Sequence, residues 1–179
     1  MKICERWNTG RLQVRKAEAR DIEELNRICT SWEDKILLEG ESFSKGYIEN
    51  SIAHGELPPI KNAQADNYYF MAIQKKDGSM IGFLDLYHGY PDNETLWIGM
   101  FLIDKEVQGN SYGQEVIQSI FEECTRTGWK SVGLGVYLKN WKGLRFWNNN
   151  GFNKIIGIYG DKVYGENAFS IIGLKKELI

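Results

Sequence analysis

An apolar run of eight residues, LWIGMFLI at 96–103, constrains the fold more than any other segment of this chain. A strand with one face in water alternates apolar and polar residues, whereas a strand covered on both faces is apolar nearly throughout. This run contains no charged residue and follows a polar turn, HGYPDNE. It therefore predicts a strand with a central position in a sheet.

Other segments predict further strands and helices around this one. Asp21 is expected to be the N-cap of a first helix, whose buried stripe includes Leu25 and Ile28. Asp77-Gly78 is typical of a hairpin turn. Strands are expected at 12–16, 68–74, 80–87, 132–138, 155–159 and 169–174, and further helices at 43–54, 112–127 and 141–149, with no structure assigned to 1–10. The order β-α-α-β-β-β-α-β-α-β-β predicts a mixed α/β domain with a largely antiparallel first half.

Composition and charge exclude several classes of function. A chain of 179 residues with 42% hydrophobic residues is expected to form one domain, at 1–179, with a sizeable core. The net charge of -2 argues against a nucleic-acid partner, and no apolar run reaches the length of a membrane span. Three cysteines without metal-type spacing and two distant histidines argue against a metal site. Reduced thiols also favour a cytoplasmic location.

The segment VQGNSYGQEVIQSIF at 107–121 has the pattern of an anion-binding turn. Gly109 and Gly113 permit positive φ and close backbone approach, and the following helix begins with unpaired N–H groups. Asn110 or Ser111 is available as the helix cap. The pattern matches neither GxxxxGK[ST] nor GxGxxG, so by itself it fits equally well a strand-to-helix turn that happens to contain glycine.

A second segment, VYLKNWKGLRFWNNNGFNKI at 136–155, gives the first one a more specific meaning. A strand is expected to end at Asn140, and a helix carrying Trp147 follows it. Gly151 has the position of a left-handed C-cap, and Phe152 returns an apolar side chain to the core.

Together the two segments resemble the paired motifs of the GCN5-related N-acetyltransferase (GNAT) superfamily, whose members transfer acetyl from acetyl-CoA to amines. The first motif of that family is Arg or Gln, two residues, Gly, one residue, and Gly or Ala, as in QGNSYG from Gln108 to Gly113. The second is Asn, an aromatic residue seven positions later, and Gly-Phe at eleven and twelve. Asn140, Trp147, Gly151 and Phe152 occupy those positions. In the order of its elements the resemblance covers 12–174.

The resemblance implies the GNAT-type acyl-CoA N-acyltransferase fold, a mixed and mainly antiparallel sheet flanked by helices, with acetyl-CoA as cosubstrate. It also implies that the strand end at 101–103 splays from the strand at 132–138, so that pantetheine pairs with free backbone groups in the gap. A backbone N–H near Leu102 would then point at the thioester oxygen. The residues implied in cofactor binding are Phe101, Leu102, Ile103, Gln108, Gly109, Asn110, Ser111, Tyr112, Gly113, Asn140 and Trp147.

Two residues depart from the family pattern. Ser111 replaces the middle glycine, and phosphate binding is expected to survive if its φ is negative. Trp147 replaces a tyrosine that is thought to protonate the departing thiolate, a task for which an indole N–H lacks an accessible pKa. Because a thiol has a pKa of roughly 8.5, the thiolate is a tolerable leaving group, and water or another side chain would supply the proton.

The acid and base of the transfer are not fixed by these motifs. Glu94 precedes the strand that leads to the thioester and is the first candidate base, although a solvated turn residue is the more common role. Asp85 lies within an apolar strand, where a carboxylate is edge-exposed, paired or functional. Tyr137 is a candidate substitute acid, with packing as its alternative. His88 is more often a surface residue than a proton carrier in such a turn.

The acceptor side is expected at 32–66, where the GNAT superfamily varies. Residues 33–66 hold seven acidic residues against three lysines, a net charge of -4 that favours a cationic amine or simply a solvated pair of helices. The expected activity is direct transfer, through a tetrahedral intermediate, to a primary amine of a small molecule. A protein N-terminus or lysine, a non-catalytic acyl-CoA-binding regulatory module and a nucleotide-phosphate binder are the alternatives. Dimers are frequent in such families, so a homodimer is an open assembly state.

Overall fold

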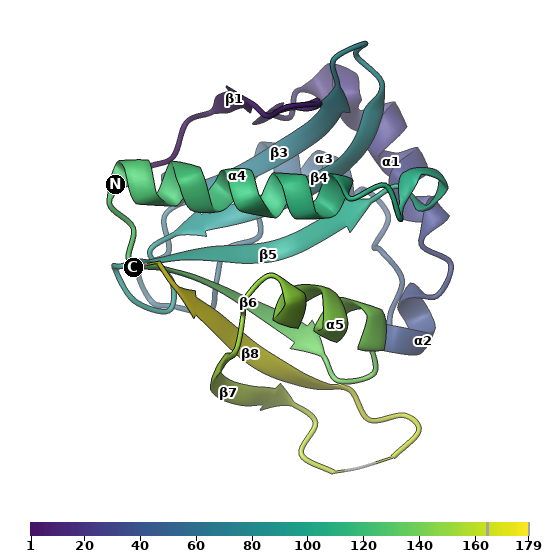
Figure 1. The fold of residues 1–179 in the computed structure, drawn as a ribbon. Coiled ribbons are helices and arrows are strands. Elements are labelled where there is room, and N and C mark those ends of the chain that lie inside the picture. The colour runs from purple at the N-terminus through teal and green to yellow at the C-terminus, as the bar shows by residue number, and fades with distance from the viewer. Residues whose placement is uncertain (164, 179) are drawn as a thin grey trace.

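The computed structural model describes residues 1–163 and 165–178. They form one eight-stranded sheet with the strand order β1-β2-β3-β4-β5-β6-β8-β7 (Figure 1). The strands are β1 (Arg6–Asn8), β2 (Leu12–Lys16), β3 (Tyr68–Lys75), β4 (Met80–His88), β5 (Thr95–Ile103), β6 (Ser131–Tyr137), β7 (Lys154–Gly160) and β8 (Ser170–Glu177). The sheet is mainly antiparallel, and β5 lies inside it between β4 and β6, which confirms the central position predicted from its apolar run.

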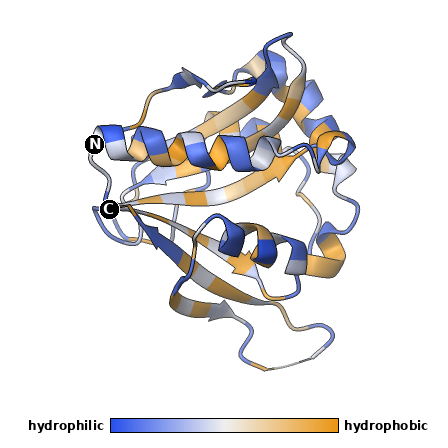
Figure 2. Cartoon of the chain, in the orientation of Figure 1, coloured by the Kyte–Doolittle hydropathy of each residue, from blue (hydrophilic) through white to orange (hydrophobic). Residues whose placement is uncertain are grey.

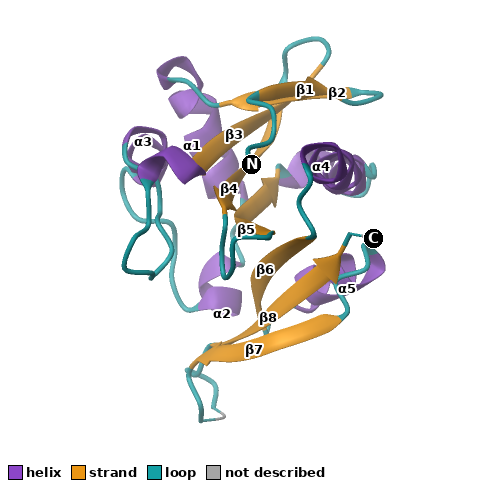
Figure 3. Ribbon diagram, turned by 90° about the vertical axis from the view of Figure 1, so that its left-hand side faces the viewer, coloured by secondary structure: helices purple, strands orange, loops and turns teal. Residues whose placement is uncertain are grey.

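The helices cover both faces of the sheet. Helices α1 (Ile22–Ser31), α2 (Lys35–Glu39) and α3 (Tyr47–Ala53) lie on one side, and α4 (Tyr112–Thr127) and α5 (Trp141–Asn149) lie on the other (Figure 3). Apolar residues concentrate in the central strands, whereas α4 alternates between hydrophilic and hydrophobic residues (Figure 2). No helix among the described residues is long and apolar enough to cross a membrane.

Strand β4 shows why helices must cover both faces of the sheet, because its side chains enter two separate cores. Leu84 and Leu86 belong to the core that also holds the buried face of α4, whereas Phe83 and Tyr87 pack with residues of α1 and α3. Successive residues of a strand point to opposite faces, so both faces of the strand are buried. The apolar composition of the central strands follows from this arrangement.

The pairing of β5 with β6 is the feature that creates an opening in the sheet. It is the parallel pair among the described strands, joined by α4, and it runs from Thr95–Ser131 to Ile98–Leu134. Beyond these residues no β5–β6 partners occur in the described sheet, although β5 continues to Ile103 and β6 to Tyr137. The two strand ends therefore diverge, as the resemblance implied.

The first half of the chain differs from the sequence analysis in three places. Residues 1–10, to which no structure was assigned, include β1, which pairs with β2, and Trp7 is buried against α4, donating to Ser119 Oγ at 2.9 Å. The short helix α2 was not predicted, and the helix expected at 43–54 is shorter, at Tyr47–Ala53. Asp21 precedes α1 but does not cap it through its side chain. Its carboxylate instead binds the buried Arg15 guanidinium, with both bonds at 2.7 Å.

Candidate functional site

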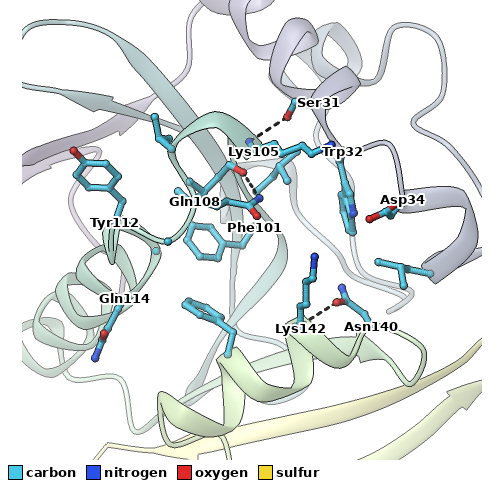
Figure 4. Close-up of a pocket in the computed structure, with 18 of the residues that line it drawn as sticks. Ser31, Trp32, Asp34, Phe101, Lys105, Gln108, Tyr112, Gln114, Asn140 and Lys142 are labelled. Atoms are coloured by element: carbon cyan, nitrogen blue, oxygen red, sulfur yellow. Dashed lines mark hydrogen bonds between the residues drawn. The ribbon is translucent and has the colours of Figure 1, made fainter.

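A cavity of about 500 Å³ lies where β5 and β6 separate (Figure 4). The end of β5, the loop and first helical turn at 108–114, and α5 form most of its wall, and residues 31–34 at the end of α1 close one side. Every residue that the resemblance implied in cofactor binding lines this cavity, except Asn110. The three candidate acid–base residues, Glu94, Asp85 and Tyr137, do not line it.

The loop before α4 carries a run of free backbone donors. From Gln108 to Gln114, no backbone N–H group donates to an acceptor in the described part of the chain. The loop is held instead through its side chains: Gln108 Nε2 donates to the Ile103 carbonyl at 2.8 Å, and Asn110 Nδ2 donates to the Val107 carbonyl at 2.9 Å. Free N–H groups at the positive end of a 16-residue helix form an anion-binding site.

The backbone at Ser111 does not have the negative φ under which phosphate binding was expected to survive the loss of the middle glycine. Its φ is +62°, in the left-handed region, and Gly109 two positions earlier has a φ of +82°. A residue with a side chain is strained in this region by roughly 1–2 kcal/mol, which explains why glycine is the usual residue here. The condition of a negative φ at Ser111 is therefore not met, but the Ser111 N–H remains among the free donors.

We expect Ser111→Gly to raise the free energy of unfolding by about 1 kcal/mol, because glycine adopts this conformation without a clash. Coenzyme A binding should be retained, since the N–H group is unchanged. Urea unfolding measures the stability, and Ser111→Ala is the matched control that removes the hydroxyl but keeps the strain. Equal stability of the glycine and alanine variants would refute the strain argument.

Aromatic side chains line the cavity beside the glycine turn. A Cβ atom at Gly113 would lie 3.3 Å from Phe146 Cε2 and 3.6 Å from Phe101 Cε1, so a larger residue would intrude on both rings. Trp147 is 8% exposed and packs against Phe101 and Phe152, with ring centroids 5.9 and 5.2 Å apart. The tryptophan therefore lies in the wall of the cavity as a packing residue.

The open edge of β5 offers backbone groups to a bound molecule. Across the β4–β5 ladder Asp104 donates its N–H to the Ile81 carbonyl at 2.8 Å. Alternate residues of an antiparallel strand direct their backbone groups to the same neighbour, so Leu102 also faces β4. Phe101 and Ile103 consequently face the open side, and the Ile103 carbonyl already accepts from Gln108. The backbone N–H that was expected near Leu102 to face the thioester oxygen is therefore that of Phe101 or Ile103, and not that of Leu102 itself.

Asn140 starts α5 and lies beside the cavity. Its Oδ1 accepts from the Gly143 N–H at 2.8 Å, which is an N-cap bond, and a Cβ at position 143 would lie only 2.9 Å from the Asn140 amide. This bond orients the side chain and leaves its Nδ2 group as a donor for the cavity. Lys142, the second residue of α5, points into the same space (Figure 4) and was not identified from the sequence.

Asp85 occupies a bulge at the point where β5 leaves β6. The β4–β5 register shifts between Leu84 and Leu86, so Gly99 and Met100 both lie opposite Asp85. Asp85 as a residue is 4% exposed, and burial raises its pKa to about 7, although the backbone N–H groups of Met100 and Gly99 act in the opposite direction. Its Oδ1 lies 2.1 Å from where a Cβ of Gly99 would be. Asp85 therefore fills the side-chain position of Gly99 and supports the bulge.

The other acid–base candidates lie away from the cavity. Glu94 is exposed and precedes β5 at its far end, roughly 26 Å along the strand from Leu102, so the structure does not bring it to the site. Tyr137 ends β6, where burial and then the nearby Glu39 and Glu41 raise its pKa. His88 is buried, and burial lowers its pKa to about 4. Its ring bonds the Asn67 carbonyl and the Ile3 N–H, which is a structural role.

Asp85 and His88, two of the buried ionisable groups, should affect stability in opposite directions. Asp85 keeps its proton up to about pH 7 in the folded state, but loses it near ~3.9 when unfolded, so the free energy of unfolding falls as pH rises through this window. His88 is neutral in the folded state above about pH 4, but is protonated below roughly 6.5 when unfolded, so its contribution rises with pH. In the wild type the two contributions oppose each other.

We expect the free energy of unfolding of Asp85→Asn minus that of the wild type to increase as pH rises between about 4 and 7, because the wild type loses the contribution of the Asp85 carboxylate in this window and the amide does not titrate. Urea unfolding at several pH values measures this difference, and His88→Gln is the control that removes the opposing contribution. A pH-independent difference between Asp85→Asn and wild type would contradict the raised pKa.

The comparisons with known proteins agree with this geometry. The sequence profile of the acetyltransferase (GNAT) family matches residues 27–152. An acetyltransferase structure from Salmonella typhimurium, which modifies the N-terminal serine of a 50S ribosomal subunit protein, is similar with a TM-score of 0.72 and 14% identity over 96% of this chain and 97% of that one. Spermidine N-acetyltransferase from Vibrio cholerae, solved with CoA and spermine, has a TM-score of 0.69 and 15% identity over 93% and 95%. At these identities the likeness shows the fold alone. No curated protein sequence matches the chain significantly.

Proposed function

Because this chain belongs to the acetyltransferase (GNAT) family, we propose that it transfers the acetyl group of acetyl-CoA to a primary amine of a small molecule. The observation that carries the proposal is the run of free N–H groups from Gln108 to Gln114 at one end of the cavity. These donors suit a pyrophosphate, which is doubly anionic and rich in acceptor oxygens.

The chain's own residues fit the rest of coenzyme A. The absence of a Cβ at Gly113 leaves room beside the loop, and the aromatic wall of Phe101, Phe146 and Trp147 suits an apolar arm. The open edge of β5 and the Asn140 Nδ2 group would donate to the amides of pantetheine. The Phe101 or Ile103 N–H would donate to the thioester oxygen and stabilise the charge that develops there in the transfer.

None of the three predicted acid–base residues lines the cavity, so proton transfer is argued from other observations. Trp147 has no acidic proton to give, so the thiolate would take its proton from water. Of the predicted acid–base residues we retain Asp85 as the proposed proton acceptor, because it adjoins the β5 bulge at Gly99, two residues before Phe101, and its pKa of about 7 suits the role. Since Asp85 does not line the cavity, a water molecule would have to relay the proton to it. A loss of turnover in Asp85→Asn at unchanged acetyl-CoA affinity would support that assignment.

The acceptor is proposed to be cationic because carboxylates gather on its side of the cavity. Glu33 and Asp34 line the cavity, and Lys105 Nζ, which lies 2.6 Å from Glu33 Oε2, offsets the charge of Glu33. Asp34 has no ion pair among the described residues and carries the negative charge of this part of the wall. Glu39 and Glu41 lie close enough to Tyr137 to raise its pKa. Negative potential at the acceptor side attracts an ammonium group and raises its local concentration. One of the two similar proteins is a spermidine N-acetyltransferase, and the other modifies the N-terminal serine of a ribosomal protein. A protein acceptor is therefore the second candidate for this chain.

Thiol release from acetyl-CoA in the presence of an amine panel tests the proposal. The panel contains diamines and polyamines, amino acids, aminoglycosides, and peptides with a free N-terminus or lysine. Release that depends on a small amine supports the proposal, whereas release with peptides alone would move the assignment to a protein acetyltransferase. Tight acetyl-CoA binding with no release on any amine would contradict the enzyme and favour a regulatory module.

A further inference from the structure

The tip of the β1–β2 hairpin, residues 9–11, is docked on the first turn of α4. Glu115 is the anchor: its Oε1 accepts from Thr9 Oγ1 at 2.5 Å and from the Arg11 N–H at 2.7 Å. Its Oε2 lies 2.6 Å from Arg11 Nε. Burial acts to raise the pKa of Glu115, but the hydrogen bonds from Thr9 and Arg11 outweigh it and hold the pKa below its usual range. The hairpin tip is therefore fixed beside the glycine turn.

From this position Arg11 reaches the loop itself. Its Nη1 donates to the Asn110 carbonyl at 3.1 Å, and its guanidinium lies 4.4 Å from the centroid of the Tyr112 ring. Because a peptide unit is planar and trans, the Asn110 carbonyl and the Ser111 N–H point in opposite directions. A bond that holds the carbonyl outward therefore turns the Ser111 N–H toward the opposite side.

We propose that Arg11 is a positioning residue for the coenzyme A phosphates, acting through the Asn110–Ser111 peptide. This inference rests on the function proposed above. The peptide needs such support because Ser111 has a φ of +62°, a conformation that the serine alone does not favour. A guanidinium can hold Glu115, the Asn110 carbonyl and the Tyr112 face at once, since its donors form a rigid planar fork. The hairpin then serves the cofactor site although it does not line the cavity.

Replacing Arg11 with methionine tests this role. We expect Arg11→Met to weaken CoA binding about tenfold, because one charge-assisted hydrogen bond is worth about that factor. Binding of S-acetylpantetheine, which lacks the phosphates, should not change. Arg11→Lys should also bind CoA weakly, because lysine keeps the positive charge but lacks the planar set of guanidinium donors. The loss of CoA affinity relative to wild type should persist in high salt, because it reflects a hydrogen bond and not a screened charge.

Lys75→Met is the matched control, since Lys75 Nζ lies 5.7 Å from the same Tyr112 ring and makes no hydrogen bond to the loop among the described residues. It should bind CoA as the wild type does, and thermal unfolding without ligand should confirm that Arg11→Lys is folded. Wild-type affinity in Arg11→Met, full rescue by Arg11→Lys, or an equal loss in Lys75→Met would overturn the positioning role. Failure of the wild type to bind CoA would instead remove the proposed function itself.

Discussion

Gly113→Asp is expected to lose coenzyme A binding, with the dissociation constant raised about 100-fold or more. The residue is part of the run of free N–H groups, and a carboxylate there would face the phosphates with like charge. The same side chain would meet Phe146, because even a Cβ would lie 3.3 Å from that ring. Calorimetric titration with acetyl-CoA measures the loss.

The control for this variant is Gln118→Asp, which adds the same charge to the exposed face of the same helix. It should bind acetyl-CoA normally, because the residue lies beyond the first turn, where the free N–H groups are. Circular dichroism should show that both variants are folded. Normal acetyl-CoA affinity in Gly113→Asp would refute the assignment of the glycine turn to the phosphates.

Gly99→Ala is expected to reduce turnover about 100-fold and to lower the free energy of unfolding by roughly 1–3 kcal/mol. The new methyl group would lie 2.1 Å from Asp85 Oδ1, so the bulge or the carboxylate must move. Phe101 lies two residues further along β5, and its N–H group is a proposed donor to the thioester. A displacement of the bulge therefore misplaces the reacting carbonyl. Steady-state thiol release and urea unfolding measure the two effects.

A double-mutant cycle separates this mechanism from general damage to the strand. Asp85→Ala empties the position that the methyl group of Gly99→Ala would enter, so the stability cost of Gly99→Ala should be smaller in the Asp85→Ala background. An equal cost in both backgrounds would show that the carboxylate does not fill the side-chain position of Gly99 in solution.

Much of the fold could be predicted because local pattern and tertiary structure agree in this chain. The helix predicted at 112–127 matches α4, since the apolar stripe and the preceding glycine turn indicate the same segment. The convergence of the 108–113 turn with Asn140 and Trp147 at one cavity followed from the two motifs. Both belong to elements with strong periodicity, for which sequence patterns are most informative.

The features that the sequence did not reveal depend on contacts between distant residues. The left-handed backbone at Ser111 follows from the geometry of the loop, not from the preference of serine. The burial of Asp85 within an apolar strand is explained by the bulge at Gly99, whose side-chain position it fills. Glu94 is distant from the cavity because it precedes β5, whereas the cavity lies at the other end of that strand. The contact of Arg11 with Asn110 joins residues 99 positions apart, and no local pattern indicates it. Residues 1–10 were likewise unassigned because a three-residue strand is too short to show a period.

The most direct test of the account is to follow the backbone amide resonances of residues 108–114 by NMR during titration with CoA. If the free N–H groups bind the pyrophosphate, the amide protons of Gly109, Ser111 and Gly113 should move downfield as new hydrogen bonds form. Pantetheine, which has no phosphates, should leave these resonances in place while it shifts those of Phe101 and Ile103. CoA binding that leaves residues 108–114 unperturbed would contradict the central claim that this loop holds the cofactor phosphates.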